Sequence, residues 1–310
     1  MEYKIIEERV LSSDGKNNIY VKIYEPQTET FTGAVQTVHG MTEYIQRYDG
    51  FMSMAAEKGY LCFGHDHVGH GYTAPDDSEL GFIASEKGDE VLVNDTEVVW
   101  KFIKEKYNLE KRFLLGHSMG SFVTRLDALL YPEDLKGYIC MGTGGSNPAA
   151  LVGLSLAKTI KKLKGERHVS EFITKLMFGT YNKRTEQITK NDWLTKDPEV
   201  IKAYAADKYC TFPFTISADI DLVNLLVKSN LQEWYDGLKK DLPIYIVSGS
   251  EDPVGDYGKG PTEVYNKLKN SGHTDVTLRL WENDRHEVLN ELDKDQVKAE
   301  IFAWIDEKNV

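Results

Sequence analysis

The sequence predicts an α/β fold with a mostly parallel sheet, and three observations support this prediction. Apolar runs typical of strands alternate with amphipathic runs typical of helices over residues 34–141, and the alternation resumes over residues 243–307. One apolar run, at residues 112–115, leads through Gly-x-Ser-x-Gly directly into a helix-like run. The chain, with 310 residues and 41% hydrophobic content, is also long enough to bury a large core. Such alternation indicates right-handed crossovers with helices on both faces of the sheet.

The elements of the first part follow in order along the chain. Residues 3–11 and 19–24 are β-type runs around a turn signal at residues 12–15, so we expect them to pair as an antiparallel hairpin. We then expect alternating strands and helices, with strands at residues 34–38, 60–63, 112–115 and 138–141 and helices at residues 48–58, 91–107 and 122–130. Pro132 stops the last of these helices.

The alternation breaks after Gly142, and no strand is predicted between residues 144 and 232. This stretch is mainly helical in pattern and rich in lysine and aromatic residues. Two strands and two helices follow it, with the strands at residues 243–248 and 276–281 and the helices at residues 262–269 and 294–307. We therefore expect an α/β core formed by residues 1–143 and 233–310, interrupted by a helical insertion at residues 144–232.

Charge and cysteine content limit the partners and the compartment. The chain carries 37 Lys and Arg against 49 Asp and Glu, a net charge of −12, so it lacks the positive field that nucleic-acid binding needs. Cys62, Cys140 and Cys210 are widely spaced and odd in number, which indicates reduced packing residues. Residues 1–9 are charged where a signal peptide would be apolar, so we expect a cytoplasmic protein.

The Gly-x-Ser-x-Gly turn makes Ser118 the candidate nucleophile. A strand that turns sharply into a helix strains the backbone of the central serine, and Gly116 and Gly120 leave the space that this turn needs. Free backbone N–H groups and the positive end of the helix dipole then lie beside the serine, which suits a developing oxyanion. A chance pentapeptide in a loop is the competing interpretation, and the strand before it and the helix after it argue against that.

Partners for this serine are sought in the loops after the last two strands, because ligands of an open α/β sheet bind beyond the carboxyl ends of its strands. Asp252 follows the first of these strands, and His286 follows the second. In the order Ser118, Asp252, His286, the histidine takes the serine proton and the aspartate orients the imidazole. Glu251 and Asp256 stay open as alternatives for the acid.

The second oxyanion donor is expected in the loop after the third strand, which begins His39-Gly40-Met41. The N–H groups of Met41 and Met119 would then bind the tetrahedral intermediate. The side chain of Met41 is expected to line an acyl pocket or to pack in the core.

Five segments in this order carry a resemblance to a known family. They are His-Gly-Met-Thr-Glu at residues 39–43 with Arg47 and Tyr48, His-Asp-His-Val-Gly-His-Gly at 65–71, Gly-His-Ser-Met-Gly-Ser at 116–121, Ser-Gly-Ser-Glu-Asp at 248–252 and Arg-His-Glu at 285–287. Together they resemble the monoacylglycerol lipase and lysophospholipase branch of the α/β-hydrolase fold.

The resemblance implies an eight-stranded sheet and a serine carboxylic-ester hydrolase that needs no cofactor or metal. It implies Ser118, Asp252 and His286 as the catalytic triad and Met41 with Met119 as the oxyanion positions. The insertion would be a lid over an acyl-binding tunnel, and the substrate a small-molecule acyl ester such as a monoacylglycerol or a lysophospholipid.

This chain departs from the pattern of the family at one point, since it has Met41-Thr42 where the mammalian enzymes have Ala-Gly. It also lacks the His-Gly-Gly-Pro-Gly signature of prolyl iminopeptidase relatives, which disfavours a peptidase.

Three other interpretations compete with this one. The same machinery suits a small-ester carboxylesterase, because function resides in the site and not in the fold. A non-catalytic binding protein of the same fold is the second, although no candidate triad residue is missing. Thirdly, His65, His67 and His70 match the His-x-His-x-Asp-His pattern of metal-dependent hydrolases, except that Gly69 replaces the aspartate. A loop explains this segment better, with His65 and His67 making structural hydrogen bonds and Gly69 and Gly71 allowing turns.

The first part of the insertion has an unusual charge pattern. Residues 148–165 combine apolar residues with Lys158, Lys161, Lys162 and Lys164, on a chain whose net charge is −12. We favour the interpretation that the apolar residues cover the active site while the lysines are solvated or pair with acidic neighbours. The alternative is a basic amphipathic helix that contacts an anionic membrane surface, where amphiphilic esters reside.

Overall fold

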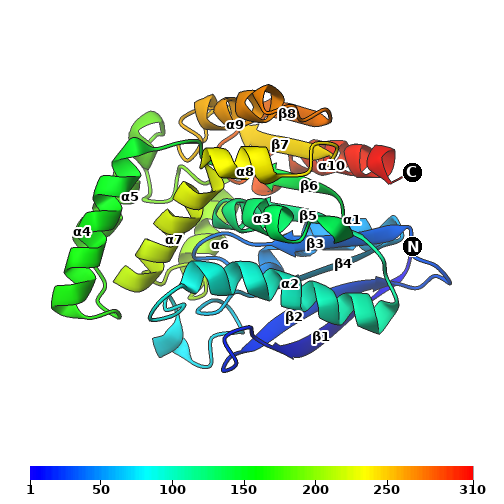
Figure 1. Ribbon diagram of the computed structural model, residues 1–310, viewed down its shortest axis with the longest axis horizontal. Helices are drawn as coiled ribbons and strands as arrows, with labels where there is room; N and C mark the ends of the chain where they lie inside the picture. Colours follow the sequence, from blue (N-terminus) through cyan, green and yellow to red (C-terminus); the bar gives the residue numbers. More distant parts are fainter. Residues whose placement is uncertain (310) are drawn as a thin grey trace.

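Eight strands form one sheet in the order β1-β2-β4-β3-β5-β6-β7-β8 in the computed structural model, which describes residues 1–309 (Figure 1). The strands are β1 (Tyr3–Leu11), β2 (Asn18–Pro26), β3 (Gly33–Val38), β4 (Tyr60–His65), β5 (Arg112–His117), β6 (Leu135–Met141), β7 (Ile244–Gly249) and β8 (Val276–Trp281). β2 is antiparallel to both of its neighbours, β1 and β4, and every other pair is parallel. The expected hairpin and the mostly parallel, eight-stranded sheet are both confirmed.

Ten α-helices lie within the described residues. They are α1 (Asp49–Glu57), α2 (Gly88–Tyr107), α3 (Met119–Leu130), α4 (Pro148–Lys164), α5 (Glu171–Phe178), α6 (Pro198–Ala206), α7 (Ile216–Ser229), α8 (Gln232–Gly237), α9 (Lys259–Asn270) and α10 (Lys294–Lys308). Three of them, α2, α3 and α9, begin three residues before the starts expected at residues 91, 122 and 262. Their first turns are polar or contain glycine or proline, so the apolar period does not reveal these starts.

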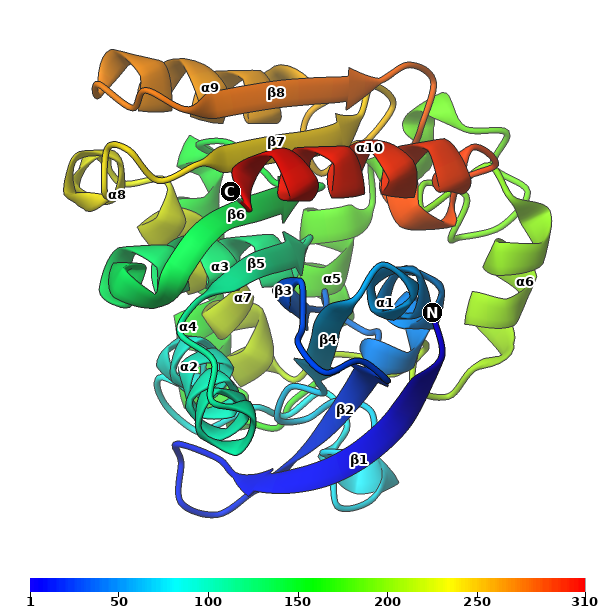
Figure 2. The same ribbon diagram turned by 90° about the vertical axis from the view of Figure 1, so that its right-hand side faces the viewer.

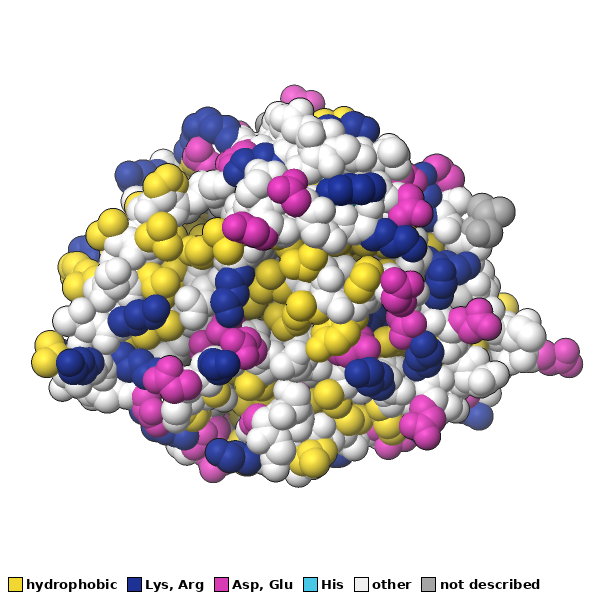
Figure 3. Space-filling model, in the orientation of Figure 1, with side chains coloured by type: hydrophobic (Ala, Val, Ile, Leu, Met, Phe, Trp, Pro, Cys, Tyr) yellow, Lys and Arg dark blue, Asp and Glu magenta, His cyan; other side chains and the backbone are white. Residues whose placement is uncertain are grey.

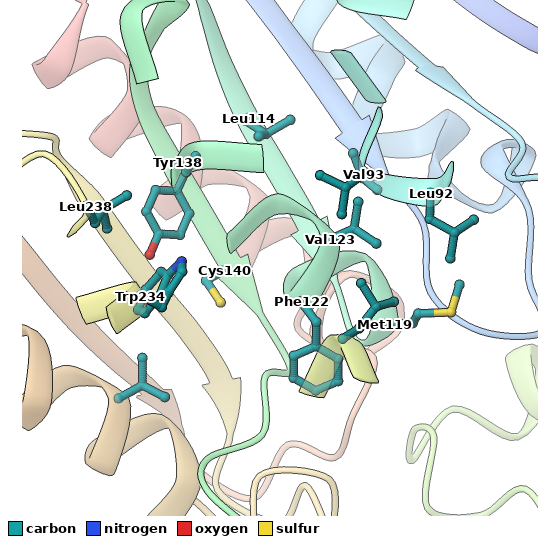
Figure 4. Packing of buried hydrophobic residues seen from close by; sticks show 14 of the residues in the cluster. Leu92, Val93, Leu114, Met119, Phe122, Val123, Tyr138, Cys140, Trp234 and Leu238 are labelled. Carbon is teal, nitrogen blue, oxygen red and sulfur yellow. The ribbon is translucent and has the colours of Figure 1, made fainter. Parts of the chain in front are cut away.

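Helices cover both faces of the sheet, and α1 and α10 share one of them (Figure 2). Strand β5 shows how its residues divide between the faces, because successive side chains of a strand point to opposite sides. Phe113 and Leu115 belong to the buried cluster with α1 and α10, whereas Leu114 belongs to the cluster with α2 and α3. Figure 4 shows this second cluster, in which Phe122 and Val123 of α3 lie among side chains of the sheet and of α2.

The region from residue 144 to 232 contains helices and loops but no strand in the described structure, as expected. Its outermost helix, α4, lies at the edge of the molecule, and α7 lies between α4 and the core (Figure 1). Ile216 and Ile220 of α7 pack with Ala157 of α4, whereas Ala218 and Leu225 belong to the core cluster around α3. Helix α7 therefore joins the insertion to the core, and the division at residues 143 and 233 stays a prediction.

Two further features of the sequence can be compared with the structure. Cys62, Cys140 and Cys210 are all buried and free, as expected for reduced packing residues. No helix within residues 1–309 combines the length and the apolar content that a span across a lipid bilayer requires.

Candidate active site

Ser118 occupies a strained turn between β5 and α3. Its backbone lies at φ 55° and ψ −120°, a positive φ that non-glycine residues rarely adopt. The turn is held because the Ser118 N–H donates to the Met141 carbonyl of β6 at 3.0 Å. A Cβ atom at Gly116 would collide with the Gly120 carbonyl oxygen, and one at Gly120 with the Val38 carbonyl oxygen. The two glycines are therefore required by packing, as the motif predicts.

His286 and Asp252 lie together at the carboxyl ends of β8 and β7. Their Nδ1 and Oδ2 atoms are 3.0 Å apart, and both side chains are buried. The other carboxylate oxygen, Oδ1, accepts the Val254 N–H at 2.8 Å, which fixes the orientation of the carboxylate. Because an ionised carboxylate only accepts hydrogen bonds, Nδ1 carries the imidazole proton, and Nε2 keeps a free lone pair.

The two competing acids lie elsewhere on the same loop. The side chain of Asp256 is 64% exposed and pairs with Lys259, and that of Glu251 is 41% exposed and lies 3.8 Å from Arg184. Of the three acids on this loop, only Asp252 has a hydrogen bond to His286 in the described structure.

His117, the residue before Ser118, links the serine turn to the His286 loop. The rings of His117 and His286 lie 4.6 Å apart, and His117 Nε2 is 3.1 Å from the His286 carbonyl oxygen. At the end of β6, Gly142 has φ 55°, and a Cβ atom there would lie 3.0 Å from His286 Cε1. The space that Gly142 leaves lets His286 approach the carboxyl ends of β5 and β6.

The loop after β3 reaches the same place. A Cβ atom at Gly40 would lie 3.0 Å from the Cβ atom of Ser118, so this backbone passes directly beside the serine. Within residues 1–309, neither the Met41 N–H nor the Met119 N–H donates a hydrogen bond to another residue. The two proposed oxyanion donors therefore lie on segments that meet at Ser118, and neither N–H is committed to another backbone carbonyl.

A buried charged network, absent from the sequence-based site, connects this loop with the histidine loop. Glu43 accepts the Gly40 N–H at 2.6 Å and lies 2.9 Å from Arg47, which forms a two-armed ion pair with Glu287 at 2.6 Å for each contact. Burial by itself would lower the pKa of His117, but its hydrogen bond to Glu43 and the charge of Glu43 raise that pKa above its ordinary value. Arg47 and Glu287 both occur in the motifs that carry the family resemblance. Their opposite charges could therefore have suggested this ion pair from the sequence.

The histidines at residues 65–70 are part of the packed interior, but the hydrogen bond expected for His65 is wrong, because neither of its ring nitrogens has a partner in the described structure. His67 Nε2 is 3.1 Å from the His39 carbonyl oxygen, and His70 Nδ1 is 3.1 Å from the Val68 carbonyl oxygen. Burial lowers the pKa of His65 to about 3 and that of His70 to about 4, so both are neutral near pH 7. In the described part of the chain, no group of three or more His, Cys, Asp or Glu side chains is placed to hold a metal ion.

The insertion also contacts the site, which the sequence did not reveal residue by residue. The ring of Trp193 lies 5.1 Å from that of His286, and the Glu287 N–H donates to the Leu194 carbonyl oxygen at 2.7 Å. On the other side, the hydroxyl of Tyr204 in α6 is 3.0 Å from the carbonyl oxygen of Thr42. Both loops that flank Ser118 are thus held by the insertion.

Comparison with known proteins identifies the family of this chain. The profile of the family described as serine aminopeptidase, S33, matches residues 30–293. The monoglyceride lipase of Rattus norvegicus is 25% identical over 96% of this chain and 89% of its own length. The monoacylglycerol lipase of Mycolicibacterium smegmatis is 23% identical over 94% of both chains.

Solved structures show the same likeness. A highly thermostable carboxyl esterase from Bacillus coagulans, solved in complex with glycerol, is 32% identical over all of both chains, with a TM-score of 0.92. A lipase in its open form is 26% identical over 99% of both chains, with a TM-score of 0.88. The chain therefore belongs to the serine aminopeptidase S33 family and is a serine hydrolase of the α/β-hydrolase fold related to monoglyceride lipases.

Proposed function

We propose that the protein hydrolyses acyl esters such as monoacylglycerols or lysophospholipids through an acyl-enzyme formed on Ser118. The observation that carries the proposal is the 3.0 Å contact between His286 Nδ1 and Asp252 Oδ2, on loops adjoining a serine held in a strained turn. A histidine oriented in this way has Nε2 available as a general base.

The reaction divides into two steps. His286 takes the Ser118 proton as the hydroxyl attacks the ester carbonyl, and it then donates this proton to the departing alcohol. Water, activated by the same histidine, then releases the acid and regenerates the serine. The N–H groups of Met41 and Met119 bind the oxyanion in both steps, and loss of one such donor costs about 3 kcal/mol of transition-state stabilisation.

We further propose that residues 144–232 act as a lid over this site and form the acyl pocket. The contacts of Trp193 with His286 and of Tyr204 with Thr42 support this assignment. Exclusion of water beneath a lid strengthens each electrostatic contact with the transition state.

The substrate class is tested by measuring kcat/KM for a chain-length series of monoacylglycerols, lysophosphatidylcholines and p-nitrophenyl esters. We expect medium or long acyl chains on glycerol to give the highest values. A maximum for acetyl and butyryl esters of simple alcohols would instead identify a small-ester carboxylesterase, which the likeness to the Bacillus coagulans esterase favours. Aminoacyl p-nitroanilides serve as a contrast, because the family description names an aminopeptidase.

A second proposed role is contact with a membrane surface, because several apolar side chains of α4 that the sequence led us to expect over the active site are exposed instead. Val152 and Leu163 of α4 are 73% and 78% exposed, and Phe172 of α5 is 61% exposed. Lys158, Lys162 and Lys164 are exposed on the same helix. Figure 3 shows hydrophobic and basic side chains side by side at the edge of the molecule where α4 lies. This combination suits an anionic lipid surface.

Binding to vesicles that contain anionic lipid should depend on these lysines. Each lysine near the surface contributes about 1 kcal/mol, so changing Lys158, Lys162 and Lys164 to glutamine should weaken partitioning by roughly two orders of magnitude. Cosedimentation at low and high salt measures this, and hydrolysis of a soluble short-chain ester should stay unchanged. Lys161→Gln is the matched control, because Lys161 is only 17% exposed and pairs with Glu86 at 3.0 Å. Equal partitioning of wild type and the triple variant would rule out docking through α4.

A further inference from the structure

Thr42, which follows the proposed oxyanion donor Met41, has an unfavourable backbone conformation. Its φ is 50°, in the left-handed region. Glycine adopts this region freely, but a β-branched residue does so only where the surroundings enforce it. Something in the structure must therefore hold Thr42 in place.

The lid residue Tyr204 makes the contacts that do this. Its hydroxyl donates to the Thr42 carbonyl oxygen at 3.0 Å and lies 3.0 Å from Thr42 Oγ1, which can donate back to it. The ring of Tyr204 is held in turn, because the Arg47 guanidinium lies 4.9 Å from its centroid. The Tyr204 hydroxyl thus contacts both the carbonyl oxygen and the side-chain hydroxyl of Thr42.

Residues of the core also fix the loop after β3, but their contacts are with Gly40 and Glu43, before and after Thr42. The Gly40 N–H is held by Glu43, and the Tyr48 hydroxyl donates to the same carboxylate oxygen at 2.8 Å. Neither of these contacts reaches the peptide group that follows Thr42. The conformation at Thr42 consequently depends on α6 of the insertion.

We infer that Tyr204 is a positioning residue that couples the lid to the oxyanion hole. With α6 in place, its hydroxyl stabilises the left-handed conformation of Thr42 and directs the Met41 N–H toward the oxyanion. Without that contact, Thr42 relaxes toward ordinary backbone angles, and the donor turns away. The inference rests on the proposed function, because it assigns Met41 as an oxyanion donor.

The test compares kcat and KM of Tyr204→Phe with those of wild type on a soluble p-nitrophenyl ester. A left-handed non-glycine residue is strained enough that loss of its support should lower kcat about tenfold, while KM changes less than twofold. The decisive variant is Tyr204→Phe combined with Thr42→Gly. Glycine needs no support at this φ, so the double variant should recover kcat to within about twofold of Thr42→Gly alone.

Tyr44→Phe is the matched control. The Tyr44 hydroxyl also joins the core to the insertion, donating to Asp207 Oδ2 at 2.8 Å, but it does not touch Thr42. It should lower kcat little, and an equal loss in both phenylalanine variants would mean that general loosening of the lid is responsible and overturn the inference. Failure of Thr42→Gly to rescue Tyr204→Phe would overturn it as well.

Failure of the inference and failure of the proposed function give different results. If Ser118→Ala still hydrolyses the ester and a fluorophosphonate does not label Ser118, the serine mechanism itself is wrong. If Ser118 is labelled and required but Tyr204→Phe has the kcat of wild type, only the coupling between lid and oxyanion hole is wrong.

Discussion

Replacing Ser118 or His286 by alanine is expected to lower kcat on an acyl ester by roughly five to six orders of magnitude. Without the Ser118 hydroxyl no acyl-enzyme forms, and without the His286 imidazole no group removes the serine proton. Steady-state hydrolysis of a p-nitrophenyl ester measures the loss, and circular dichroism checks that both variants remain folded.

The double variant distinguishes a triad from two independent contributions. Residues that act as one unit lose their effect together, so Ser118→Ala with His286→Ala should be little worse than either single variant. Multiplied losses in the double variant would contradict the assignment, since they would mean that each residue acts without the other.

Asp252→Asn is expected to lower kcat by up to about four orders of magnitude. The asparagine amide can donate to Nδ1 and thereby favour the wrong tautomer of His286, which places the proton on Nε2. Because the amide is close in shape to the carboxylate, its oxygen can still accept the Val254 N–H, and the fold should be kept. The measurement is kcat over a pH series together with the melting temperature.

Glu251→Gln and Asp256→Asn are the matched controls for this variant. Both acids are on the same loop, and their side chains are 41% and 64% exposed and have no contact with His286 in the described structure, so kcat should stay within about twofold of wild type. A large loss in either control with a small loss in Asp252→Asn would show that the acid is misassigned.

The sequence alone determined the features that depend on neighbours along the chain. The strands at residues 34–38 and 276–281 and the helix at 48–58 follow from hydrophobic period, and the structure places them within one residue of the expected ends. The strained turn at Ser118 was predicted from a local motif, because the steric demand of this turn falls on Gly116 and Gly120, two residues away on either side. Local steric demands and hydrophobic period can be recognised in a sequence because the residues that produce them lie within a few positions of one another.

The pairing of Asp252 with His286, rather than of either neighbouring acid, was decided by the tertiary structure. So was the network in which Arg47 meets Glu287, 240 residues further along the chain. The contact between Thr42 and Tyr204 spans 162 residues and joins the core to the insertion. Contacts of this kind leave no period in the sequence, because each side chain satisfies its own local pattern without reference to the other. These residues come together in two ways. The sheet order places the carboxyl ends of β3, β5, β7 and β8 on the same side of the molecule, and α6 lies beside those ends (Figure 2).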